Sequence, residues 1–413
     1  ESVTAEEIKN GQGVVTMDVS FTMAENVPYL ALTLMPIDGD TLTDVRVENG
    51  RVLCRGEARD IARLNINLRC GARVILVLHK FRATDFESLF QGVRAVHWED
   101  WIPREGEFPV VGYSINSTLH SVPACQSIVK KAVVDRLSAA YGIAQLPETG
   151  RRYQVRFSIM KDEVTVGLDT SGEGLYKRGY RAHGVAAPLK ETLAAAMVKL
   201  SHYNGRDPFC DPFCGSGTII IEAATIACNM APGLNRRFGF ERFRGFDSTA
   251  WQRIKKEARM AVNFDVPVNL AGSDISTLIV DRAQKNAVLA GISQWVNEGK
   301  VRFSACDARE VQPSSETPGL IVTNPPYGEQ SNPKSASVAS MMKNVADNLK
   351  RNFAGWAVWM LTSDRELPRQ MRLKESKKIV FFNGPLECRF FRFVMTAGSN
   401  RKEDVSQKET SSD

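Results

Sequence analysis

The sequence predicts an α/β protein of more than one domain, with a doubly wound, mostly parallel sheet in its C-terminal half. The chain has 413 residues, which is more than one hydrophobic core usually holds. From residue 188 onward, short apolar strands alternate regularly with helices. Several of these strands end at Asp or Asn, at the sheet edge where open α/β sheets bind ligands.

The N-terminal half has a mixed α and β pattern. Residues 1–45 show no clear periodicity, and we treat them separately from an α+β region over residues 46–170. A long amphipathic helix is predicted over 121–141, because Ile128, Val129 and Leu137 share one face and Gly142 follows. Lys161-Asp162 predicts a hairpin turn. The other expected elements are strands 74–78, 110–115, 155–160 and 163–168 and a helix over 86–96.

The C-terminal half begins after a basic, aromatic connector that we place at residues 171–187. A helix over about 188–200 opens the α/β domain, which extends to residue 397. Residues 398–413 are polar, and we predict a disordered tail there. The expected strands are 209–211, 270–274, 301–304, 320–324, 356–361, 379–382 and 389–395.

Composition limits the class of protein only broadly. The formal net charge of +6 is compatible with a nucleic-acid partner, and equally with an ordinary solvated surface. We see neither a signal peptide nor an apolar run long enough to span a bilayer, so we expect a cytoplasmic protein without a membrane partner. The eight cysteines are scattered without a CxxC pair, which favours reduced thiols and no metal site.

The first chemical motif is a glycine-rich turn between strand 209–211 and the following helix. It reads Asp211-Pro212-Phe213-Cys214-Gly215-Ser216-Gly217-Thr218. The two glycines allow a sharp turn and close approach of the backbone to a ligand. No Lys follows Gly217 as in a nucleoside-triphosphate loop, and Ile220 replaces the third glycine of a dinucleotide loop. A carboxylate at Asp211 instead suits the sulfonium or ammonium end of S-adenosylmethionine, although a simple packing turn is the alternative.

Two more carboxylates follow the next two strands. Asp274 is placed to accept hydrogen bonds from both ribose hydroxyls, and Asp307 to meet the adenine amino group. A lone Asp at a strand end is more often a helix cap, but three at successive strands favour a cofactor edge. We assign the neighbouring Ile275 and Ala308 to the same site.

The most specific signal is Asn324-Pro325-Pro326-Tyr327, directly after strand 320–324. The prolines make the loop rigid, and the Asn324 side chain and the Pro325 carbonyl are both acceptors for the hydrogens of one amino group. Held in this way, the amine directs its lone pair away from the aromatic ring to which it is attached. Tyr327 offers a face for stacking a planar base. The alternative, a proline-rich turn with an Asn cap, does not explain its position at this edge.

These residues resemble the class I amino-methyltransferases, whose catalytic loop is (Asn/Asp)-Pro-Pro-(Tyr/Phe/Trp). The wider pattern is similar to bacterial THUMP-domain RNA guanine-N2 methyltransferases, over roughly residues 46–395. The motifs that carry this resemblance are the runs 175–181 and 187–195, the glycine-rich turn, 324–329, 123–132 and 98–103. The stretch 1–36 does not match that family's N-terminal module well.

The resemblance implies a ferredoxin-like N-terminal part, a THUMP module that binds RNA, and a Rossmann-like catalytic domain. It implies S-adenosylmethionine as cofactor, bound by Asp211, Gly215, Gly217, Asp274 and Asp307, with Asn324 at both the cofactor and the base. We also expect RNA, preferably ribosomal, to contact the connector at Lys177, Arg178, Tyr180 and Arg181, which mix cations with aromatic rings. The basic segment 236–259 is a second RNA candidate, and a solvated helix surface is the alternative.

Other functions remain open. The tetrapeptide alone fits an amino-methyltransferase of adenine or cytosine in DNA equally well, and only the N-terminal half favours RNA. A non-catalytic RNA-binding protein on the same fold is disfavoured by the intact Asn324 and Tyr327. A nicotinamide-dependent oxidoreductase is disfavoured by the missing third glycine.

Overall fold

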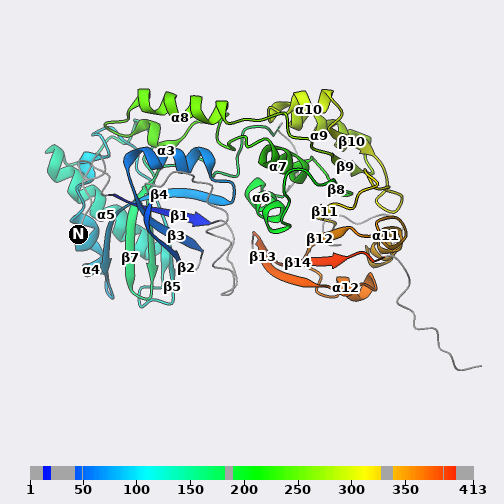
Figure 1. Ribbon diagram of the computed structural model, residues 1–413. Coiled ribbons are helices and arrows are strands. Elements are labelled where there is room, and N and C mark those ends of the chain that lie inside the picture. Colours follow the sequence, from blue (N-terminus) through cyan, green and yellow to red (C-terminus); the bar gives the residue numbers. More distant parts are fainter. Residues whose placement is uncertain are drawn as a thin grey trace, which may run out of the picture.

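The chain folds into two lobes, each with its own sheet, as the computed structural model shows (Figure 1). The structure describes residues 13–19, 42–48, 50–181, 189–326, 338–384 and 386–396. Some expectations lie outside these residues: the tail at 398–413, most of the segment 1–41, the end of the connector at 182–187, and the base-stacking role of Tyr327.

The N-terminal sheet has the strand order β2-β3-β1-β4-β7-β6-β5 within the described residues. Its strands are β1 (Gly13–Val19), β2 (Thr43–Glu48), β3 (Arg51–Gly56), β4 (Gly71–Arg82), β5 (Val110–Ile115), β6 (Val155–Met160) and β7 (Glu163–Asp169). Strand β1 lies inside this sheet, antiparallel to both β3 and β4. The separation of residues 1–45 from the region that follows is therefore wrong for β1 and β2, because both strands hydrogen-bond into the same sheet.

Helices α3 (Ala58–Asn67), α4 (Phe86–Arg94) and α5 (Val122–Tyr141) pack on one face of this sheet. Alternate strand residues such as Val74, Leu76 and Leu78 point into that core because side chains of a strand alternate between its faces. Gly142, in a left-handed conformation at φ 62°, ends α5 as predicted. The predicted hairpin is also confirmed, since Lys161 and Asp162 both have positive φ between β6 and β7.

The C-terminal sheet has the order β10-β9-β8-β11-β12-β14-β13. Its strands are β8 (Phe209–Asp211), β9 (Leu270–Asp274), β10 (Val301–Ala305), β11 (Leu320–Thr323), β12 (Ala357–Thr362), β13 (Lys377–Asn383) and β14 (Leu386–Val394). The first five strands of this order run parallel, and β14 and β13 add an antiparallel edge. All seven predicted strands are confirmed: the bounds of β8 and β9 are as predicted, and those of the others are shifted by at most three residues.

Helices cover both faces of the C-terminal sheet, as expected for a doubly wound fold. The helices are α6 (Glu191–Leu200), α7 (Thr218–Ala227), α9 (Thr277–Leu289), α10 (Ser293–Asn297), α11 (Val338–Asn352) and α12 (Leu367–Gln370). Trp359 and Leu361 of β12 pack in the core with α6 and α7, whereas Val358 and Met360 pack in the core with α11. Adjacent residues of one strand therefore fill two separate cores.

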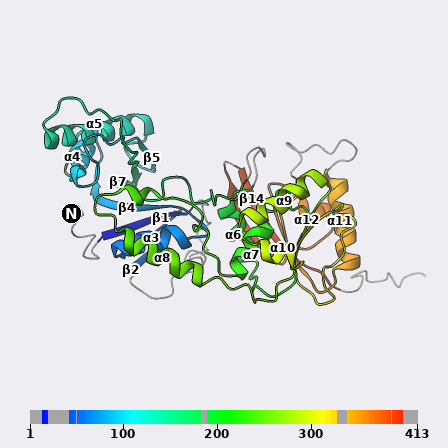
Figure 2. The same cartoon turned by 90° about the horizontal axis from the view of Figure 1, so that it is seen from above.

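The segment between α7 and β9 joins the lobes. It contains the 3-10 helix η2 (Gly239–Arg242) and α8 (Ser248–Met260), and Figures 1 and 2 both show α8 beside α3 on the N-terminal lobe. Trp251 and Ile254 of α8 belong to the core of that lobe. The Trp251 ring contacts Phe238 and Phe240 edge-on. Arg236, in the same segment, donates to the carbonyls of Glu173 and Gly174. This segment therefore clamps the lobes together.

A buried ionic cluster forms the rest of the joint. Arg69, 5% exposed, donates to the carbonyls of Thr225 and Met230 across the junction. Arg178 pairs with Glu222 of α7 at 3.4 Å and also donates to the Leu68 carbonyl. Both charges of that pair are almost completely buried, so removing either one leaves the other without its counter-charge.

The joint corrects the RNA assignment of the connector. Arg178 and Tyr180 are each only 5% exposed, and both contact Glu222 inside the protein, so the prediction that they contact RNA is wrong. Arg181 is bound to Glu191 and to the Leu189 carbonyl. Lys177 is exposed, with its ammonium on Glu173. The basic and aromatic residues of the connector therefore stabilise the contact between the lobes, because Arg178 and Arg181 donate to buried acceptors.

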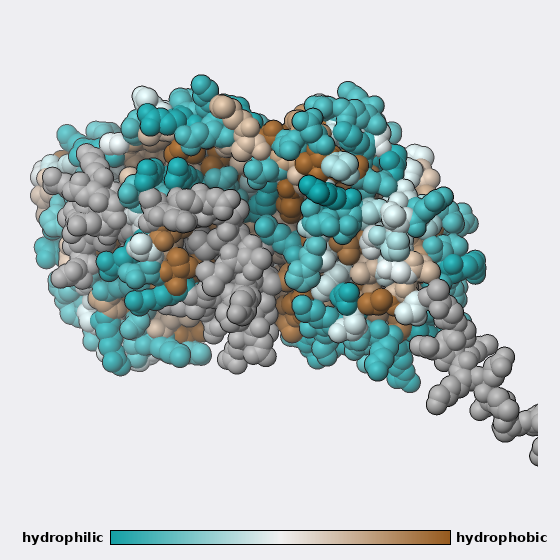
Figure 3. All heavy atoms as spheres, in the orientation of Figure 1, coloured by the Kyte–Doolittle hydropathy of each residue, from teal (hydrophilic) through white to brown (hydrophobic). Residues whose placement is uncertain are grey.

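The surface facing the viewer in Figure 3 is mostly hydrophilic on both lobes, with apolar patches beside the junction. Within the described residues, no helix is both long and apolar enough to cross a membrane.

Replacing Trp251 with Ala should destabilise the protein by about 3–5 kcal/mol, because a large buried ring is lost from the clamp. Chemical denaturation measures this loss, and limited proteolysis should show new cleavage within residues 231–262. Lys256→Ala, on the exposed side of the same helix, is the control and should change neither reading. If both variants were equally stable, the segment between α7 and β9 would not hold the lobes together through Trp251.

Candidate cofactor and amine-binding site

The candidate site lies where the strand order of the C-terminal sheet reverses, between β8 and β11. These two strands are paired in parallel, so Asp211 at the end of β8 and Asn324 just after β11 lie at the same edge. The hydroxyl of Thr323 donates to Asp211 Oδ1 at 2.6 Å. The start of the glycine-rich loop and the start of the tetrapeptide are therefore joined by a buried hydrogen bond.

The glycine-rich loop has the backbone conformation that its glycines allow. Gly215 and Gly217 have φ of 51° and 84°, in the left-handed region, and Gly217 caps the N-terminus of α7. Among the described residues, a Cβ on Gly215 would meet nothing within 4 Å, so these residues leave space open beside the loop. A Cβ on Gly217 would lie 3.0 Å from Ala283 Cβ. Gly215 therefore leaves room for a ligand, and Gly217 lets the start of α7 pack closely against α9.

Asp274 is held against the same loop. Its Oδ2 accepts from the Gly215 backbone N–H at 3.2 Å, and its Oδ1 accepts from the Ser276 N–H at 3.0 Å. The loop and the end of β9 are tied again by the Cys214 N–H, which donates to the Ser273 carbonyl at 2.8 Å. The predicted carboxylate is thus brought beside the predicted glycines.

Asp307 lies two residues beyond the end of β10, and its carboxylate is engaged. Arg309 donates to it from both its side chain and its backbone, which lowers the pKa of the Asp307 carboxyl. An adenine amino group would have to share or replace the Arg309 guanidinium at this carboxylate.

Sequence reasoning missed two residues that fix the loop. Asn286 of α9, 3% exposed, donates its side-chain amide to the Ser216 carbonyl at 3.0 Å. Thr323 anchors Asp211 as described above. Neither residue belongs to a motif. Asn286 could have been noticed in the sequence as a polar residue on an otherwise apolar helix face.

Asp211 has the most unusual electrostatics at this site. It is 1% exposed, and its Oδ2 has no hydrogen-bond partner within the described part of the chain. Burial raises the pKa of this carboxyl to about 7, although the Thr323 hydroxyl and the Phe213 N–H lower it in part. A buried carboxylate with an unused oxygen fits a cationic group, such as the ammonium of S-adenosylmethionine.

The remaining predicted residues surround this edge. Asn324 and Pro326 are half-buried and Pro325 is buried. Pro212, Cys214, Ser216, Thr218 and Ala308 are buried, whereas Ile275, next to Asp274, is 73% exposed. Burial strongly raises the pKa of the Cys214 thiol, so this cysteine packs the loop and is no nucleophile. All eight cysteines are free, and no group of three or more potential metal ligands occurs in the described ranges.

A family model described as "RMKL-like, methyltransferase domain" matches residues 178–392, which contain this whole site. This chain belongs to that family. The THUMP domain model matches residues 83–169, and the RlmL ferredoxin-like domain model matches residues 40–75. The predicted fold class and the predicted family are thereby confirmed. The ferredoxin-like match includes β2 and β3, and it begins after the stretch 1–36, which does not resemble the family's N-terminal module.

Two relatives extend this result. "Putative RNA methyltransferase YpsC" of Bacillus subtilis is 39% identical over 362 residues, 87% of this chain and 92% of that protein. "Ribosomal RNA large subunit methyltransferase K/L" of Shewanella baltica is 34% identical over 349 residues, 83% of this chain. The match covers 48% of the Shewanella protein, so this chain spans about half the length of its K/L relatives.

Two solved structures have the same architecture. SMU.472, described as "a putative methyltransferase" and crystallised with S-adenosylhomocysteine (SAH), superposes with a TM-score of 0.80 at 33% identity, over 94% of this chain and 99% of that one. A Listeria monocytogenes chain described as a predicted N6-adenine-specific DNA methylase has a TM-score of 0.79 at 38% identity, over 93% and 96%. SAH is S-adenosylmethionine without its methyl group, and these findings confirm S-adenosylmethionine as the cofactor of this methyltransferase domain.

The raised pKa of Asp211 predicts a pH-dependent affinity for SAH. The pKa of the Asp211 carboxyl is higher in the folded protein than in the unfolded chain, so its protonation stabilises the ligand-free fold at low pH. This stabilisation is lost as the pH rises through about 7. An ammonium group favours the ionised carboxylate, so SAH affinity should increase by up to about tenfold per pH unit below pH 7 and then level off. Calorimetry on wild type and Asp211→Asn measures this, and parallel pH profiles would rule out the role of Asp211.

Asp274→Ala should weaken SAH binding by a few-fold to a hundredfold, as expected from losing about 1–3 kcal/mol of charged hydrogen bonding. Part of the loss comes from the Gly215 N–H, which loses its acceptor. Asp265→Ala, an exposed carboxylate in the turn before β9, is the matched control. If calorimetry gave both variants the wild-type affinity, Asp274 would not belong to the site.

Proposed function

We propose that the protein methylates the exocyclic N2 amine of guanine in structured RNA, with ribosomal RNA as the preferred substrate. The observation that carries this proposal is the Asn324-Pro325-Pro326 segment, which starts beside Asp211 on the reversal edge of the sheet. The THUMP match and the RNA named for the Bacillus and Shewanella relatives support RNA over DNA. Guanine N2 rests on the resemblance of the whole chain to THUMP-domain guanine-N2 methyltransferases.

S-adenosylmethionine, when bound, supplies an electrophilic methyl group. Asp211 would hold its ammonium group, Asp274 its ribose hydroxyls, and the open space beside Gly215 would admit it to the loop. Asn324 Oδ1 and the Pro325 carbonyl would accept the two hydrogens of the target amine, so that its lone pair no longer conjugates with the ring. Catalysis then consists of positioning and hydrogen-bond polarisation, without a strong general base.

Asn324→Ala should leave SAH affinity nearly unchanged but abolish methyl transfer, because the lost acceptor acts mainly in the transition state. Asn324→Asp keeps an acceptor oxygen and should retain part of the turnover. Single-turnover transfer of tritiated methyl to RNA measures the rate, and calorimetry measures the affinity. Near-normal turnover in the Ala variant would remove the tetrapeptide from the mechanism.

The substrate is identified by tritiated methyl transfer to total RNA and, separately, to DNA, followed by nucleoside analysis. N2-methylguanosine in the RNA is the expected product. N6-methyladenine in DNA would instead favour the second candidate, which the description of the Listeria chain supports. Label in neither substrate, with SAH still bound, would favour a binding protein on the same fold. We place this activity in the cytoplasm, where the eight free cysteines would stay reduced.

A further inference from the structure

Three charged side chains gather at the carboxyl edge of the C-terminal sheet, on the same edge as the proposed amine-binding tetrapeptide. The members of this edge cluster are Arg365, Glu387 and Arg389. Strands β11, β12 and β14 are consecutive neighbours in the sheet (Figure 1). Met360 of β12 pairs with Thr323 of β11, and two residues further on Thr362 pairs with Arg389 of β14. Arg389 therefore lies level with Pro325, two strand spacings or about 10 Å away along the sheet.

The edge cluster offers an acceptor and donors side by side. Glu387 Oε1 lies 2.5 Å from Arg389 Nη2 and 3.0 Å from Arg365 Nη2. The hydrogen bond from Arg389 is the main cause of the lowered pKa of the Glu387 carboxyl, so this group stays ionised at neutral pH. No described residue donates to the second oxygen, Glu387 Oε2, and the side chain is 41% exposed. Arg365, 67% exposed, keeps N–H donors that bind none of the described residues.

The three bases that carry an exocyclic amine differ in what stands next to that amine on the Watson–Crick edge, the edge by which enzymes read a base taken out of its stack. In guanine, the N2 amine stands beside N1–H, which is a donor, and the acceptor O6 follows. In adenine and cytosine, the amine stands beside a ring nitrogen that carries a lone pair. An ionised carboxylate only accepts hydrogen bonds, so it attracts N1–H of guanine and repels the lone pair of the other two bases.

We propose that Glu387 selects guanine as the methylated base: its Oε2 accepts from N1–H and Arg365 donates to O6, while Asn324 and Pro325 hold the N2 amine. This inference rests on the proposed function and names the residues that choose the base. The edge of a purine and one extended side chain together bridge the gap between Pro325 and β14. Arg389, only 13% exposed, is a positioning residue, because it holds the Glu387 carboxylate without facing the base.

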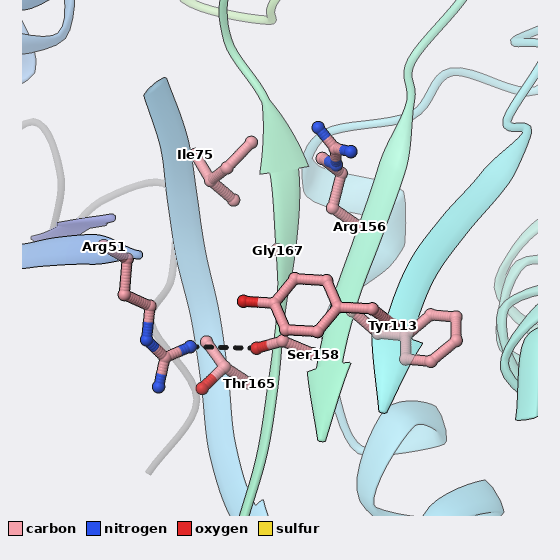
Figure 4. A pocket seen from close by; sticks show the side chains of 8 residues that line it. Arg51, Ile75, Tyr113, Arg156, Ser158, Thr165 and Gly167 are labelled. Carbon is pink, nitrogen blue, oxygen red and sulfur yellow. Dashed lines mark hydrogen bonds between the residues drawn. The ribbon is translucent and has the colours of Figure 1, made fainter. Parts of the chain in front are cut away.

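An arginine-lined hollow on the N-terminal sheet lacks this pairing of acceptor and donors. There, Arg51 donates to the Ser158 hydroxyl at 2.9 Å (Figure 4). None of the described residues that line this hollow carries a carboxylate. The combination that guanine requires is therefore found at the edge cluster, beside the tetrapeptide, and not in that hollow.

The test starts from the guanosine that the full-length wild-type protein labels in RNA. An oligoribonucleotide of that site is made with guanosine or with 2-aminopurine at the target, because 2-aminopurine keeps the amine but has neither N1–H nor O6. Wild type should prefer guanosine by roughly 5- to 150-fold in kcat/KM, the effect of about 1–3 kcal/mol of base discrimination. Glu387→Gln should narrow this preference, since an amide accepts from N1–H but also donates to a lone pair. Arg365→Ala should slow transfer to guanosine and leave transfer to 2-aminopurine unchanged.

Glu375→Gln is the matched control, because Glu375 is an exposed carboxylate at the opposite end of the β13–β14 hairpin, and it should keep the wild-type preference. Exposed ion pairs contribute little to stability, so all these variants should fold, and calorimetry with SAH checks this. Wild-type protein that labels adenine or cytosine, or no RNA, would overturn the proposed function and this inference with it. Labelling of guanosine with the wild-type preference retained in both Glu387→Gln and Arg365→Ala would overturn only the role of the edge cluster.

Discussion

The parallel pairing of β8 with β11 is the constraint on which the candidate site depends. Successive strands β8, β9 and β10 extend to one side of this pair, and β11 and β12 extend to the other. The segments that follow β8 and β11 therefore leave the sheet at its reversal point, where open α/β sheets bind ligands. The Thr323–Asp211 hydrogen bond joins the two strand ends there, and it brings a buried carboxylate next to the start of the proposed amine-binding tetrapeptide.

Helix α7 connects this edge to the N-terminal lobe. It begins at the glycine-rich loop and carries Glu222, the buried partner of Arg178, about one turn further along. Thr225, near its other end, accepts from Arg69. One short helix thus touches the cofactor loop at its N-terminus and the lobe with the THUMP match along its length. Because buried charges tolerate little displacement, the lobes are held at a defined orientation.

The two lobes therefore have distinct roles. The C-terminal lobe carries the methyltransferase match and the candidate site, while the N-terminal lobe is built from the parts that match the RlmL ferredoxin-like and THUMP models. Arg236 of the clamp segment, which the sequence suggests as an RNA contact on charge alone, instead donates to the carbonyls of Glu173 and Gly174 in the joint.

The sequence by itself determined the strand–helix alternation, the glycine-rich turn and the Asn-Pro-Pro loop, because these follow from local backbone preferences and from short apolar runs. The family followed from the same motifs. Only the tertiary structure decided the burial of Arg178 and Tyr180, since their partner Glu222 lies more than forty positions away. It also decided the roles of Asn286 and Thr323, and it placed β1 within the N-terminal sheet. Contacts between distant segments depend on packing, which periodicity within one segment does not encode.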